Sequence, residues 1–192
     1  MPGFKYYNFI LFPMKINTPF LCRFSAILIS FFWQLNPAIG QSLSVLDTKN
    51  GFRDVRFETS ISSEPGMKFS AVDKSLPNVK QYTRPADKLT LGQAELYDII
   101  YSAYKGTFFR VRLEFDSSDA AKIFKALTEV YGEPTKSIPA PVGGNWSQYQ
   151  WNGEKVTMIM NFTGLDNWVT IVSNTLMDQI EKDRTKQISH DL

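Results

Sequence analysis

Apolar and charged residues alternate without interruption along residues 109–115, which is the most regular pattern in the chain. Every second residue from Phe109 to Phe115 is apolar, and the three residues between them are charged. Successive side chains of a strand point to opposite faces, so this pattern predicts a strand with one buried face. The preceding run Leu96–Tyr104 is rich in Tyr and Ile, and Gly106 suits the positive φ of a tight turn. The two runs predict an antiparallel hairpin whose strand face buries Phe109 together with Val111 and Leu113.

The period changes directly after this strand. Asp116 and Ser117 are good N-cap residues, and Gly132 and Pro134 are typical of a helix end. Between them apolar residues recur at spacings of three and four, as on one stripe of an α-helix: Ala120, Ile123, Phe124, Leu127, Val130 and Tyr131. The pattern predicts a helix over about 117–131, packed on the apolar face of the hairpin.

Shorter signals complete the predicted fold. Asn152-Gly153, between apolar runs, is a strong hairpin signal. Trp168–Val172 predicts the last strand, and residues 43–47 a short first strand. A second helix is expected over about 175–186, capped by Thr175, with fraying from about residue 187. The expected fold class is α+β: a largely antiparallel sheet of about six to seven strands with both helices packed on one face.

The first 40 residues differ in composition from the rest and predict a secretory signal peptide. They contain basic but no acidic residues, an apolar run at 24–33, and small residues before Gln41. The basic region before the apolar run is unusually long when counted from Met1 and of ordinary length when counted from Met14, so Met14 is the expected start of translation. A stable membrane span is not expected after cleavage, because spanning a bilayer needs about 20 apolar residues. An uncleaved anchor is the alternative, and the mature protein is expected to be one domain over 41–192.

Charge and residue inventory exclude several function classes. Removing residues 1–40 leaves 18 of the 21 basic residues against 19 acidic ones, a net charge of about −1, so nucleic acid is not expected as a partner. Cys22, the lone cysteine, leaves with the signal, and His190 is the lone histidine. We therefore expect the mature chain to have too few histidine and cysteine residues for a zinc site, a Cys-His pair or a Ser-His-Asp triad. No metal or other cofactor is expected.

Two carboxylates are the candidate catalytic residues. Glu114 and Asp116 are two residues apart on the predicted strand, which places both on one face at about 6.6 Å of rise. Inverting glycosidases separate their two carboxyl groups by a similar distance. The same spacing is found on any solvated strand face, and the neighbouring Arg112 favours simple charge pairing.

Aromatic residues suggest a binding surface instead. Trp146 follows a loop that contains Gly143 and Gly144, where its ring would be partly exposed, and exposed aromatic rings bind sugars, peptides and apolar ligands. Trp146, Asn145 and Tyr149 are therefore the candidate ligand-binding residues. In the alternative interpretation, Trp151 and Trp168 form the core and Trp146 covers its edge.

The order of these elements resembles a group of small uncharacterised secreted or periplasmic bacterial α+β proteins. The shared features are a "YKG" or "FKG" hairpin, here at residues 104–106, an amphipathic helix, and a "YGxP" stop, here at residues 131–134. The resemblance covers about residues 89–174. It implies a bacterial envelope context and carries no catalytic residue.

These observations favour a secreted or periplasmic, non-enzymatic binding module. Its contact surface would be the open face of the sheet or the loop over residues 138–146, and its partner a protein, peptide or glycan of the envelope. Two alternatives stand beside it: a carboxylate-dependent hydrolase centred on Glu114 and Asp116, and a structural subunit of an envelope assembly.

Overall fold

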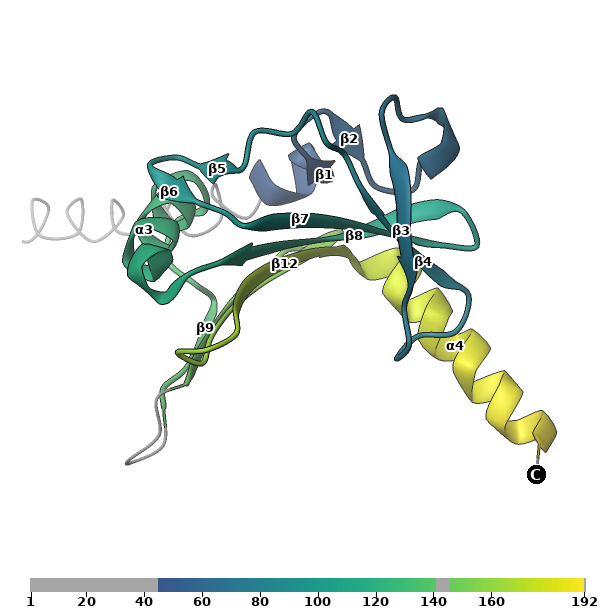
Figure 1. The fold of residues 1–192 in the computed structure, drawn as a ribbon. Coiled ribbons are helices and arrows are strands. Elements are labelled where there is room, and N and C mark those ends of the chain that lie inside the picture. The colour runs from purple at the N-terminus through teal and green to yellow at the C-terminus, as the bar shows by residue number, and fades with distance from the viewer. Residues whose placement is uncertain (1–44, 141–145, 192) are drawn as a thin grey trace, which may run out of the picture. The chain divides into compact units, whose positions relative to one another are not determined.

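The computed structural model describes residues 45–140 and 146–191, all within one compact unit, Ala38–Leu192. It is built on an eight-stranded sheet in which every neighbouring pair is antiparallel (Figure 1). In spatial order the strands are β3 (Lys68–Val72), β4 (Val79–Thr83), β7 (Asp98–Tyr104), β8 (Thr107–Phe115), β12 (Asn167–Ser173), β11 (Val156–Phe162), β10 (Ser147–Asn152) and β9 (Lys136–Ile138). The α+β class and the antiparallel sheet are confirmed, with more strands than the six to seven expected.

Smaller elements surround this sheet. Two short hairpins are formed by β1 (Gly51–Phe52) with β2 (Val55–Arg56) and by β5 (Thr90–Leu91) with β6 (Ala94–Glu95). The helices after residue 49 are the 3-10 helices η2 (Ile61–Ser63) and η3 (Ser117–Asp119) and the α-helices α3 (Ala120–Tyr131) and α4 (Asn174–Asp191). The helix expected over 117–131 is present as η3 followed by α3. Residues 45–49 are helical, so the short strand expected over 43–47 is wrong for its described part. The helix expected over 175–186 continues to Asp191, where fraying was expected.

The larger hydrophobic core lies on one face of the sheet. Alternate residues of β7, β8, β12, β11 and β10 point into it, and it is covered by α3 and the β1–β2 segment. Ile123 and Leu127 of α3 are buried in the same cluster as Val111 and Leu113 of β8, as the change of period predicts. Packing of one apolar strand face against one apolar helix stripe is therefore the basis of the fold.

A bulge in the central hairpin changes which aromatic ring enters this core. Ser102 pairs with Arg110 while Ala103 pairs with Phe108, so Phe109 is an extra residue in β8. An extra residue locally resets the alternation of side chains. Phe108 joins the larger core, and Phe109 joins a smaller core on the opposite face. The expectation that Phe109 shares an interior with Val111 is therefore wrong.

Helix α4 packs on the face opposite α3, which corrects the expectation that both helices share one face. It follows β12 without a loop, and Ser173, rather than Thr175, accepts a hydrogen bond from the N–H of Leu176 at 3.4 Å. Leu176 and Ile180 then complete the smaller core with Val172 and Phe109. Figure 1 shows α4 on the side of the sheet away from β1 and β2.

The hairpin of β10 and β11 turns two residues later than its sequence suggests. Asn152 pairs with Thr157, and the N–H of Gly153 donates to the carbonyl of Val156 at 2.9 Å, so Glu154 and Lys155 form the turn. The Asp47 carboxylate accepts hydrogen bonds from the three N–H groups of residues 154–156 at 2.8–3.0 Å. These bonds tie the helical residues 45–49 to the turn between β10 and β11.

Replacing Gly153 by alanine is expected to cost about 1–3 kcal/mol, the usual range for overpacking. An added Cβ would lie 2.3 Å from Asp47 Oδ1, and three hydrogen bonds hold that carboxylate in place. The same substitution in an Asp47→Ala background should cost less than about 1 kcal/mol, because the clash is gone. Urea denaturation of the four proteins of this cycle measures the coupling. If the stability losses of the two single variants add up to the loss of the double variant, the two residues do not interact as described.

The predicted signal peptide over residues 1–40, with Met14, lies outside the described residues. Among the helices that the structure does describe, none is long and apolar enough to cross a membrane.

Candidate functional site

The α4-bearing face of the sheet is only partly covered, and its open part carries the candidate site. Residues that alternate with the core positions form rows across the strands on this face. In the central row, Arg112 of β8 pairs with Ile100 of β7 on one side and with Thr170 of β12 on the other. Thr170 in turn pairs with Ile159 of β11. A cation therefore stands between apolar and hydroxyl side chains at the middle of the sheet.

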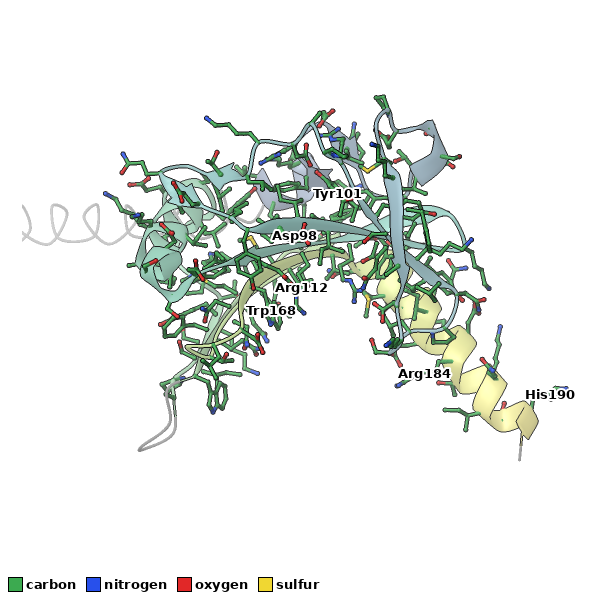
Figure 2. The ribbon with its side chains drawn as sticks, viewed as in Figure 1. Asp98, Tyr101, Arg112, Trp168, Arg184 and His190 are labelled. Carbon is green, nitrogen blue, oxygen red and sulfur yellow. The ribbon has the colours of Figure 1, made fainter. Side chains whose placement is uncertain are left out.

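This open part is hollowed, with a volume of about 400 Å³. We call it the α4-side hollow. Its floor consists of Ile100, Ser102, Arg110, Arg112, Ile159, Trp168, Thr170 and Val172, and its walls of Asp73, Ser75, Gln81 and Met177. Figure 2 shows Arg112 and Trp168 on the side of the sheet that faces α4, whereas Tyr101 lies on the opposite side. The volume falls in the range of pockets that hold one small molecule, about 300–1,000 Å³.

The Arg112 guanidinium lies over the ring of Trp168, with its central carbon 5.0 Å from the ring centroid. Such cation–π stacking orients both groups and leaves the edges of the guanidinium accessible. Arg112 Nε is 2.8 Å from Glu114 Oε1, an ion-pair distance. The same buried Nε has no aligned hydrogen-bond partner among the described residues, so this pair is electrostatic rather than a directed bond.

Arg110, the second cation of the hollow, is already engaged. Its Nη2 donates to Asp73 Oδ2 at 2.5 Å and to Ser102 Oγ at 3.2 Å. Asp73 also accepts from the N–H and hydroxyl of Ser75. Burial opposes ionisation of this carboxyl, but the hydrogen bonds from Ser75 and Arg110 prevail and lower the pKa of Asp73 to about 2. The hollow therefore contains a closed ion pair between Arg110 and Asp73 at neutral pH.

The two candidate catalytic carboxylates lie outside the α4-side hollow. Glu114 stands at the end of β8, is 20% exposed and pairs with Arg112. Asp116 follows the strand, is exposed, and occupies the N-cap position of η3 without making a capping hydrogen bond through its side chain. Glu114 belongs to β8, and Asp116 lies one residue beyond its end in an extended backbone conformation.

Of the three candidate ligand-binding residues, the structure describes Trp146 and Tyr149, which lie directly before β10 and within it. Asn145 lies outside the described residues. Trp146 is 39% exposed, and Tyr149 packs on Phe124 of α3 with ring centroids 4.6 Å apart. Tyr149 lines a separate hollow of about 210 Å³ between α3 and the β10–β11 hairpin, and Trp146 does not. Neither Trp146 nor Tyr149 lines the α4-side hollow.

Sequence reasoning missed the pairing of Arg112 with Trp168. The core interpretation holds for Trp151, which is fully buried, but Trp168 is half-buried on the opposite face. The alternation of Trp168 and Thr170 with the buried Val169 contains the signal, because neighbouring strand residues point to opposite sides. The alternation does not show which face of the sheet stays open, because that depends on where α4 packs.

No cluster of three or more His, Cys, Asp or Glu side chains in residues 45–140 and 146–191 is placed to hold a metal ion. His190 is exposed near the end of α4, far along the helix from the hollow (Figure 2). Comparisons of the chain with protein-family models, with curated proteins and with solved structures give no match. Interpretation of the hollow therefore depends on its own geometry.

Proposed function

We propose that the protein is a secreted or periplasmic binding module without catalytic activity, and that the α4-side hollow is its contact surface. The observation that supports this proposal is the half-exposed Arg112–Trp168 pair at the floor of a hollow of about 400 Å³. An antiparallel sheet commonly leaves one face in water, so the support comes from the hollow and the stacked Arg112–Trp168 pair together rather than from exposure of the face. The secreted location rests on the sequence of residues 1–40.

A carboxylate-dependent hydrolase has less support. Catalysis by two carboxyl groups needs both on opposite sides of the bond to be cleaved, with space between them for the substrate. Glu114 is paired with Arg112, and neither Glu114 nor Asp116 lines the hollow. No further feature of the described residues favours the structural subunit over the binding module.

The proposal is tested by screening the purified chain against a library of small fragments with two-dimensional NMR. Fragments are expected to shift the indole N–H signal of Trp168 and the amide signal of Thr170. Thr170→Trp, which fills the hollow, should abolish these shifts. Gln150→Trp is the matched control. Gln150 of β10 is on the same face of the sheet as Thr170 but does not line the hollow. Shifts confined to Trp146 and Tyr149, or no shifts at all, would overturn the proposal.

A further inference from the structure

We infer that the α4-side hollow selects a small organic anion: a planar or apolar body that carries one carboxylate or sulfonate group. This inference rests on the proposed function and specifies the ligand class of the same site. It depends on three properties of the hollow, namely the partly exposed guanidinium of Arg112, the apolar floor and the size.

The charge that is free to meet a ligand is positive. Asp73 and Arg110 form an ion pair at 2.5 Å. The Ser75 hydroxyl donates a hydrogen bond to Asp73, and the Ser102 hydroxyl accepts one from Arg110. Arg112 is the other charged residue of the lining, and its side chain is 39% exposed. The guanidinium of Arg112 is therefore the charged group of the lining that a ligand in the hollow would contact.

Glu114 reduces this charge without consuming the binding capacity of Arg112. It lies beside Nε, outside the lining, and makes no aligned hydrogen bond with that atom. A guanidinium has five N–H donors in a rigid fork, which matches the two oxygens of a carboxylate. Stacking on Trp168 limits rotation of the guanidinium and so reduces the entropy lost when an anion binds.

The remaining surface of the hollow fits an apolar body. Ile100, Ile159, Val172 and Met177 line it together with the Trp168 ring. A planar ring system could contact these side chains while its acidic group reached Arg112. Nearby Thr170 adds a hydroxyl next to the guanidinium. The volume of about 400 Å³ suits one such molecule rather than a folded partner.

The test uses three probes of nearly equal shape with different charges: 1-naphthaleneacetate (anionic), 1-naphthaleneacetamide (neutral) and 1-naphthylmethylammonium (cationic). Dissociation constants are measured from the Trp168 indole signal of the full chain. We expect the anion to bind at least about 10-fold tighter than the amide, because a charge-assisted hydrogen bond adds at least about 1.4 kcal/mol. The cation should bind more weakly than the amide. Added salt should weaken the anion's binding only.

Arg112→Gln should reduce the affinity for naphthaleneacetate to that for the amide and leave the amide's affinity within about twofold. Arg184→Gln is the matched control, since Arg184 is a half-exposed arginine of α4, ion-paired to Glu181 and located away from the hollow (Figure 2). Unchanged signals of the buried Trp151 verify that each variant folds.

The outcomes separate this inference from the proposed function. Equal affinities of the three probes, a preference for the cation, or a preference for the anion that survives Arg112→Gln would overturn the ligand class while the binding module stands. If no probe shifts the Trp168 signal although fragments of other chemistry do, the ligand class is likewise overturned. If neither probes nor fragments shift it, both proposals fail.

Discussion

Trp151→Ala is expected to lower the free energy of unfolding by about 3–5 kcal/mol, a large part of the roughly 5–15 kcal/mol of an ordinary domain. Trp151 is fully buried on β10, and its ring centroid is 6.2 Å from that of Phe124 of α3. Its indole N–H donates to the carbonyl of Gly132, just past the end of α3, at 2.8 Å. The substitution therefore removes both an apolar contact and a polar contact between α3 and the sheet.

Urea denaturation followed by circular dichroism measures this effect without depending on tryptophan fluorescence. Trp146→Ala is the matched control and should cost less than about 1 kcal/mol, because that ring is 39% exposed. Trp151→Phe keeps most of the ring but loses the hydrogen bond, and should cost about 1–2 kcal/mol. A Trp151→Ala variant as stable as Trp146→Ala would contradict the packing described here.

Asp87→Ala is expected to cost about 3–5 kcal/mol, the usual effect of removing one partner from a buried ion pair. Asp87 is 5% exposed and accepts hydrogen bonds from Arg84 Nε at 2.8 Å and from the Tyr101 hydroxyl at 2.5 Å. Arg53 approaches the same carboxylate at 3.2 Å. Without Asp87, two guanidinium groups and one buried hydroxyl lose their shared acceptor. Burial, together with the Asp87 hydrogen bond, raises the pKa of Tyr101, so the hydroxyl remains a donor at neutral pH.

Asp54→Ala provides a control that involves the same arginine. Asp54 accepts two hydrogen bonds from Arg84 at 2.7 and 2.9 Å but is 65% exposed. Water replaces an exposed partner readily, so this substitution should cost about 1 kcal/mol or less. The two variants are compared by thermal and urea denaturation at pH 7. Equal losses of stability would show that burial of Asp87 adds nothing to the arginine network.

The hairpin and the first helix could be predicted because their signals are local. Alternation up to Phe115 and a three-and-four spacing up to Tyr131 each report which side of a single element is apolar. Both elements appear at the predicted residues, and their apolar sides meet in the larger core. The bulge at Phe109 was missed, because an extra residue is defined by its pairing with the neighbouring strand and not by the strand's own sequence.

The candidate site was less predictable than the fold. The composition of one loop favours Trp146 and its neighbour Tyr149, whereas the hollow joins residues of five strands and α4 that are far apart in the sequence. The sequence predicts Arg112 as a charge partner of the carboxylates, and its contact with Trp168 depends on the pairing of β8 with β12. A site on an open sheet face is assembled from one or two side chains per strand, so no contiguous motif marks it.

The sequence alone determined the secondary structure of the central hairpin and α3 and the antiparallel α+β class. These follow from residue types and local periodicity. Only the tertiary structure decided that α4 packs on the face opposite α3 and leaves the centre of that face open around Arg112 and Trp168. The choice of face depends on the direction in which the chain leaves β12 and on which side still has apolar surface to bury, and both are properties of the assembled sheet.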